Sequence, residues 1–188
     1  MKRLALASLS LSVLAGCTTA STDASDQPSA EPTPQHWICG REYENFAWGY
    51  QRRGVVLDGY GNVWRYDFKG TPASLPNPWH AKDLNALTEA ELKVRYNGAA
   101  DTGKHVADDD IARHMALIRE AARTPPTEGR HVGADMGATV VYCLARNVPG
   151  ATYRQVLIDQ KGDVESTNPS SAAKELAAWL NGVFKGEN

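Results

Sequence analysis

Aromatic residues at every second position are the sequence feature that most constrains the fold of this chain. They occur in two neighbouring stretches, as Phe46, Trp48 and Tyr50 and then as Trp64, Tyr66 and Phe68. Side chains two apart in a β-strand share a face, whereas a helix would scatter them around its circumference. The alternation therefore predicts β-strands, each with one aromatic face.

Four stretches of sequence are predicted to supply the sheet. ICGREYENFAWGYQ (38–51) is expected to form one strand, and GVVLDGYGNVWRYDF (54–68) two strands around a turn that contains glycine. Further along, GATVVYCLARN (137–147) is rich in β-branched residues, and TYRQVLIDQKGDVEST (152–167) has the pattern of a second hairpin. This arrangement places Cys143 in a central strand.

Three helices are predicted between and after these strands. Thr88 and Glu91 have the spacing of a capping box for a helix over 89–97, which Gly98 would end. The acidic residues at 108–110 suit the start of a second helix, which ends before Pro125. A third helix, from about Ser171, carries a hydrophobic stripe formed by Ala173, Leu176, Ala177, Leu180 and Phe184.

Together these elements predict one α+β domain over residues 37–188. Its expected order is β-β-β-α-α-β-β-α, with an antiparallel sheet built of hairpins and helices mainly on one face. About 150 residues is a common size for a single domain with a substantial core.

The N-terminal segment MKRLALASLSLSVLAG (1–16) has the layout of a signal peptide. Lys2 and Arg3 precede a hydrophobic run that is broken only by serines and becomes polar at Thr18. A helix that spans a bilayer needs about 20 hydrophobic residues, and this run has about a dozen. The segment is therefore too short for a permanent transmembrane anchor.

Leu14, Ala15 and Gly16 lead directly into Cys17. This order resembles the lipobox of bacterial lipoprotein precursors, and the resemblance is confined to the first 20 or so residues. It implies that the chain is cut before Cys17 and that Cys17 carries fatty chains such as palmitate, which anchor the protein to a membrane. In Gram-negative lipoproteins an Asp after the cysteine commonly retains the protein in the inner membrane. Thr18 stands there in this chain, so the resemblance favours the outer membrane, with the domain in the periplasm.

The polar stretch that follows Cys17, TTASTDASDQPSAEPTPQH (18–36), contains no large hydrophobic side chain. Such a composition cannot offset the entropy lost on ordering. Residues 17–36 are therefore expected to be a lipidated cysteine and a disordered tether that holds the domain clear of the membrane.

Cys39 and Cys143 remain once Cys17 is assigned to the lipid anchor. An exported domain lies in an environment that permits oxidation, so the two are expected to form a disulfide that brackets most of the fold. The alternative is a pair of separately buried thiols.

Charge and spacing exclude several functional classes. The formal net charge of −2 becomes about −4 once Lys2 and Arg3 are removed with the signal peptide, which argues against nucleic acid as a partner. The turn after Asp58 lacks the ligand positions of a calcium loop. Asp110, His114 and His105 lack a recognised zinc spacing, so no metal and no other cofactor is expected.

No catalytic residue can be assigned from the sequence. There is no G-x-S-x-G motif. A hydrolase would need a carboxylate paired with one of the histidines His80, His105, His114 and His131, and sequence does not show such a pair.

The aromatic residues allow two interpretations. Covered by helices, they are core; exposed, Trp48, Tyr50 and Trp79 form a candidate binding surface for a partner protein or for sugar rings. Trp79 lies in a Pro-rich loop and is the best candidate for exposure. The expected function is a non-enzymatic binding module of the cell envelope, for another envelope protein or cell-wall glycan. The alternative is a lipid-tethered hydrolase with a His/carboxylate pair.

Overall fold

A computed structural model describes residues 36–47, 49–70, 84–146 and 152–187. In these ranges the chain forms nine strands and three helices. The strands are β1 (Trp37–Asn45), β2 (Tyr50–Asp58), β3 (Asn62–Gly70), β4 (Leu87–Thr88), β5 (Ala100–His105), β6 (Arg130–His131), β7 (Ala138–Arg146), β8 (Thr152–Gly162) and β9 (Val164–Thr167). The helices are α1 (Glu89–Arg95), α2 (Asp108–Ala121) and α3 (Ser171–Val183).

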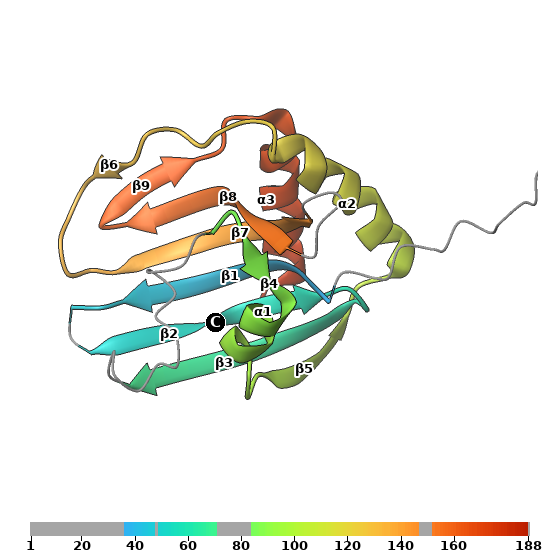
Figure 1. Cartoon of the computed structure of the whole chain (residues 1–188), viewed down its shortest axis with the longest axis horizontal. Helices are drawn as coiled ribbons and strands as arrows, with labels where there is room; N and C mark the ends of the chain where they lie inside the picture. Colours follow the sequence, from blue (N-terminus) through green and yellow to red (C-terminus); the bar gives the residue numbers. More distant parts are fainter. Residues whose placement is uncertain (1–35, 48, 71–83, 147–151, 188) are drawn as a thin grey trace, which may run out of the picture. The chain divides into compact units, whose positions relative to one another are not determined.

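The strands form one antiparallel sheet in the order β5-β3-β2-β1-β7-β8-β9-β6, with β4 paired to β8 (Figure 1). Strand β1 lies in the middle, between β2 and β7. This confirms the predicted α+β domain, its antiparallel sheet and the order of its long elements. The short strands β4, β5 and β6 were not predicted.

The two faces of the sheet carry separate hydrophobic clusters. Helices α2 and α3 pack against the face that includes Leu57 and Cys143. The short helix α1 packs on the opposite face, where Leu92 joins Tyr66 and Tyr142. In Figure 1, α1 lies in front of the sheet and α3 behind it. Two of the three helices thus share one face, as predicted.

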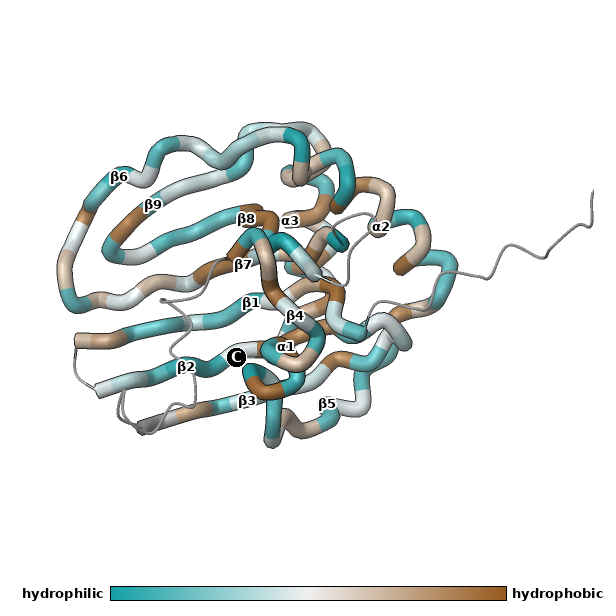
Figure 2. The backbone as a smooth tube through the Cα atoms, viewed as in Figure 1, coloured by the Kyte–Doolittle hydropathy of each residue, from teal (hydrophilic) through white to brown (hydrophobic). Residues whose placement is uncertain are grey.

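The long central strands are unevenly hydrophobic along their length. Their fully buried runs are the first residues of β1, the last residues of β2 and positions 142–145 of β7. Because neighbouring strands are antiparallel, these runs lie side by side, toward α2 and α3 (Figure 2). Glu42 and Glu44 lie toward the opposite end of β1, where burial is less continuous.

The predicted capping box of α1 is present. The Glu91 backbone N–H donates to Thr88 Oγ1 at 3.2 Å, and the Thr88 backbone N–H donates to Glu91 Oε2 at 2.8 Å. The helix ends at Arg95, two residues before the predicted end. Helix α3 begins as predicted at Ser171, after an N-cap in which Ser170 Oγ accepts from the Ala173 N–H at 3.1 Å.

The prediction of a single strand over 38–51 was wrong. Strand β1 ends at Asn45 and β2 begins at Tyr50, with Asn45 paired to Gln51. The Asn45 side chain accepts a hydrogen bond from the Ala47 N–H at 2.9 Å, and Gly49 has a φ of 96°. The alternation of aromatic residues therefore runs through a turn and does not mark one continuous strand.

Cys39 and Cys143 form the predicted disulfide, with an S–S distance of 2.04 Å. The two residues are direct partners in the register of β1 and β7, and both are fully buried.

The predicted signal peptide, Cys17 and most of the tether lie outside the described residues. Residues 33–188 group as one compact unit. Within the described ranges, no helix combines the length and hydrophobicity needed to cross a membrane.

Candidate functional site

The alternation of β1 directs two carboxylates to the α1 face of the sheet. Cys39 belongs to the hydrophobic cluster under α2 and α3. Successive side chains of a strand point to opposite faces, so Glu42 and Glu44, each an odd number of residues from Cys39, point to the α1 face. Helix α1 brings Arg95, its last residue, over the same face. We call Glu42, Glu44 and Arg95 the ion cluster.

Arg95 bridges the two carboxylates of the ion cluster. Its Nη2 contacts Glu42 Oε1 and lies 3.1 Å from Glu44 Oε1. The side chains of Arg95 and Glu42 are 1% and 2% exposed, while Glu44, at 16%, is the outermost member. Arg52 of β2 donates to the backbone carbonyl of Arg95 and holds the end of α1 in place.

Tyrosines complete the inner part of the ion cluster. Tyr66 Oη donates to Glu42 Oε2 at 2.6 Å, so both oxygens of Glu42 have partners. Burial, reinforced by Glu42, raises the pKa of Tyr66 well above its usual value, so this hydroxyl remains a donor. Tyr142 reaches Tyr96 only by lying across Gly40, where a Cβ would come within 2.6 Å of the Tyr142 hydroxyl.

Glu44 is poorly neutralised compared with Glu42. Burial raises the pKa of Glu44 to about 7, the negative charge of Glu42 adds to the effect, and Arg95 only partly opposes it. Glu44 therefore exchanges its proton near neutral pH, which is a property of groups that bind or react.

Glu44→Gln should change how stability depends on pH. Between about pH 4.5 and 7 the unfolded chain loses the Glu44 proton while the folded chain keeps it, so the free energy of unfolding falls as pH rises. The loss is complete above about pH 7 and amounts to at most about 3 kcal/mol. Thermal unfolding at pH 5 and pH 8 should show this decline in the parent protein and a smaller one in Glu44→Gln. The exposed variant Glu175→Gln is the control, and an equal decline in all three proteins would refute the effect.

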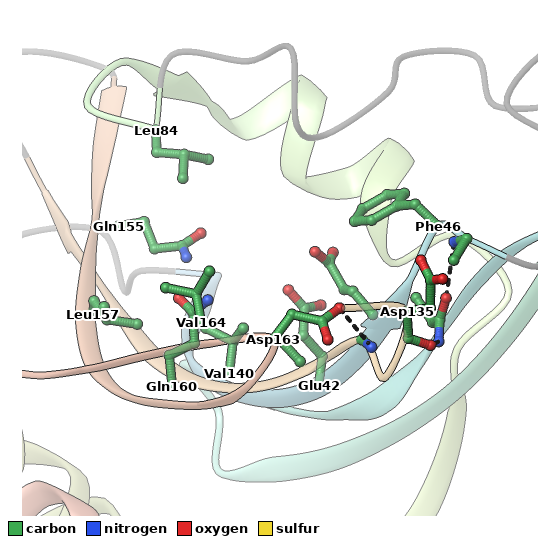
Figure 3. A pocket seen from close by; sticks show the side chains of 15 residues that line it. Glu42, Phe46, Leu84, Asp135, Val140, Gln155, Leu157, Gln160, Asp163 and Val164 are labelled. Carbon is green, nitrogen blue, oxygen red and sulfur yellow. Dashed lines mark hydrogen bonds between the residues drawn. The ribbon is translucent and has the colours of Figure 1, made fainter. Parts of the chain in front are cut away.

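A pocket of about 650 Å³ opens beside the ion cluster on the α1 face. Figure 3 shows Leu84 and Leu157 on one side of it, Phe46 and Asp135 on the other, and Glu42 between them. This volume is in the range of small-ligand and peptide sites. We call it the sheet pocket.

The rim of the sheet pocket near Asp135 is held in place by hydrogen bonds. Asp163 accepts from the backbone N–H groups of Met136 and Gly137, each at 3.0 Å. Asn45 Nδ2 donates to the Asp135 carbonyl at 3.1 Å. Gly137 has a φ of 72°, and a Cβ there would lie 2.4 Å from the Glu44 carbonyl oxygen, so the loop approaches β1 as closely as only glycine permits.

Hydrophobic side chains stand exposed at this rim. Phe46 lines the sheet pocket and is 45% exposed, and Met136, in the loop that Asp163 fixes, is 55% exposed. Large exposed hydrophobic residues next to a pocket are typical of interaction surfaces.

The candidate binding surface predicted from the sequence is not supported at Tyr50. Its ring is 2% exposed and packs against Phe46 and Phe68, so Tyr50 belongs to the interior, and its place in that surface is a correction. Trp48, Trp79 and Cys17 lie outside the described residues, so their predicted roles stay predictions.

None of the described histidines lines the sheet pocket. His114 of α2 contacts Asp110 at 3.4 Å, but it is buried and stacks on Trp179 of α3 at 3.9 Å, so this pair belongs to the packing of the two helices. His105 and His131 are exposed in β5 and β6, and His80 lies outside the described residues.

In the described part of the chain, no group of three or more His, Cys, Asp or Glu side chains could hold a metal ion.

Sequence reasoning missed the ion cluster. Two glutamates at alternate positions of a strand that begins with a buried hydrophobic run are unusual. Arg95 follows Leu92 at helical spacing on a buried face. Charged residues at core positions indicate buried pairing, and this was the available signal.

The chain matches no protein family model, no curated protein and no solved structure. The geometry of the sheet pocket is therefore the basis for a functional proposal.

Proposed function

We propose that this chain is a lipid-anchored cell-envelope protein whose domain binds another envelope polypeptide in the sheet pocket. The supporting observation is a pocket of about 650 Å³ with exposed hydrophobic side chains beside it: Phe46 lines the pocket, and Met136 lies between the lining residues Asp135 and Gly137. Exposed hydrophobic side chains beside a pocket with both polar and aliphatic lining suit a polypeptide segment with mixed side chains.

A partner polypeptide is favoured over a cell-wall glycan by the placement of the rings. Sugar recognition uses open aromatic faces. Most described tyrosines on the α1 face are buried, including Tyr50, Tyr66, Tyr142 and Tyr153. Phe46 is the aromatic side chain at the rim of the sheet pocket in the described part of the chain.

Binding is also favoured over hydrolysis. The alternative hydrolase was expected to use a His/carboxylate pair, and none of the described histidines lines the sheet pocket.

The proposed anchor is Cys17, which would place the domain in the periplasm, with the outer membrane favoured by Thr18. Cys17→Ser should abolish incorporation of a clickable fatty acid and leave an uncut precursor, because serine offers no thiol for acylation. Thr18→Ser is the matched control and should label normally. Unchanged labelling of Cys17→Ser would rule the anchor out.

Binding at the rim is tested by placing a photo-crosslinking residue at Phe46 in intact cells, where an adduct with a second polypeptide is expected.

A further inference from the structure

A second pocket, of about 360 Å³, lies between strands β2 and β3 and the end of α1. Figure 1 shows α1 in front of these two strands. The lining of the pocket includes Arg52 of β2, Tyr66 and Phe68 of β3, and Lys93, Val94 and Asn97 from α1 and the turn after it. Strand β1 separates this pocket from β7 and β8, which line the sheet pocket. We call it the arginine pocket.

Arg52 contributes a buried cation to the arginine pocket. It pairs with Glu44 in the register of β1 and β2, so its side chain points to the α1 face, and the residue is 7% exposed. Its Nη2 donates to the backbone carbonyl of Arg95, and its guanidinium lies 5.3 Å from the centre of the Tyr66 ring. These contacts hold the guanidinium in place, but neither supplies a full negative charge.

The guanidinium of Arg52 has no carboxylate in contact with it among the described residues. None of their ion pairs includes Arg52, since Glu42 and Glu44 both pair with Arg95. The Nε of Arg52 is buried and donates no hydrogen bond to a described group. Burying a charge without a partner is costly, so an anion that accepts from this guanidinium would be stabilised in the pocket.

The lining of the arginine pocket does not provide this anion. Asp67 is part of the lining, but it pairs with Arg53 of β2, and side chains at that register position point to the opposite face of the sheet from Arg52. Lys93, on the exposed side of α1, adds a second positive charge at the rim. The described lining therefore favours an anionic ligand on the α1 face.

Hydrophobic side chains lie next to Arg52. Phe68 is its register partner on β3, so the two side chains stand side by side on one face of the sheet. Val94, which is 50% exposed, directly precedes Arg95, whose carbonyl accepts from Arg52. A carboxylate matches one guanidinium in charge and in planar geometry, and a hydrophobic group attached to it would cover Phe68 and Val94.

We propose that the arginine pocket binds an organic carboxylate with a short hydrophobic group, held by the Arg52 guanidinium. The hydrophobic group lies against Phe68 and Val94, and Lys93 strengthens the attraction from the rim. This chemistry occurs in free carboxylic acids and at the C-terminus of a polypeptide that ends in a hydrophobic residue. The inference goes beyond the proposed function, because it does not require a partner in the sheet pocket.

The test uses the full mature protein, lipidated and held in micelles of a nonionic detergent. The probes N-acetylleucine and N-acetylleucinamide share a hydrophobic group and differ in charge. Titration followed by chemical shifts should show at least about tenfold tighter binding of the acid than of the amide. The peptide acetyl-Ala-Ala-Leu with a free C-terminus separates the two sources: binding as tight as that of N-acetylleucine indicates a polypeptide C-terminus, and weaker binding indicates a free acid.

Two variants test the position of the carboxylate. Arg52→Gln should lose the preference for the acid, while Arg53→Gln, on the opposite face of β2, should keep it. Arg52 also supports the end of α1, so a second test uses the exposed position 94. Val94→Glu should bind N-acetylleucine at least about threefold more weakly than Val94→Lys, because the two variants place opposite charges beside the site.

Equal binding of the acid and the amide would overturn the inference. So would a preference for the acid that survives Arg52→Gln, equal binding by Val94→Glu and Val94→Lys, or inorganic phosphate that binds as tightly as N-acetylleucine. Crosslinking at Phe46 is a separate readout in a different pocket, so failure of the carboxylate site is distinguishable from failure of the proposed function.

Discussion

Arg95→Met should lower the free energy of unfolding by about 3–5 kcal/mol at pH 7, because it leaves a buried carboxylate without its cation. Glu42 is 2% exposed, and Arg95 is its ionic partner. Methionine fills much of the space of arginine. The decrease in the free energy of unfolding therefore comes mainly from the uncompensated charge and only slightly from a cavity. Urea unfolding followed by circular dichroism measures the difference.

Two comparisons separate the charge effect from general damage to α1. Lys93→Met, on the exposed side of the same helix, should change stability by less than about 0.5 kcal/mol. Adding Glu42→Gln to Arg95→Met removes the buried charge and should restore part of the loss. A loss below about 1 kcal/mol in Arg95→Met would show that the ion cluster is not a buried charge pair.

Replacing both Cys39 and Cys143 with alanine should lower the free energy of unfolding by about 2–5 kcal/mol. The bond joins residues 104 apart in sequence, so it restricts a large part of the unfolded chain. The two positions are also fully buried between β1 and β7, where smaller side chains leave unfilled space.

Denaturant unfolding of the oxidised protein and of the double variant measures this effect. Peptide mapping without reduction should recover Cys39 and Cys143 in one linked pair. Two free thiols after acid trapping, or a double variant as stable as the parent, would contradict the disulfide.

Local sequence signals predicted the elements whose causes are local. The helix α1 follows from the Thr88 and Glu91 capping box, and α3 from its hydrophobic stripe. Strands β7 and β8 follow from β-branched runs that the core then buries. Signals of this kind depend on neighbours along the chain, so one sequence is enough to find them.

Elements that depend on distant partners were missed. Strands β4 and β6 are two residues long and exist only because β8 and β9 pair with them. Strand β5 is largely exposed at the sheet edge and has no hydrophobic alternation. The break between β1 and β2 was hidden because the aromatic residues continued the pattern of a strand.

The site was missed for the same reason. Glu42 and Arg95 lie 53 residues apart, and their contact depends on where α1 packs on the sheet. The composition of β1 showed two glutamates in a strand, but not that they share one guanidinium. Tyr50 was only a candidate for the binding surface, because alternation identifies a face of the strand and cannot say whether that face is covered.

The most direct measurement of the central claim is site-specific photo-crosslinking in intact cells that express the tethered protein. The crosslinking residue replaces Phe46, at the rim of the sheet pocket, and in the control Ala178, exposed on α3. The account predicts that position 46 forms an adduct with a second polypeptide and that position 178 does not. No polypeptide adduct at position 46, the same adducts at both positions, or an adduct to glycan alone would contradict it.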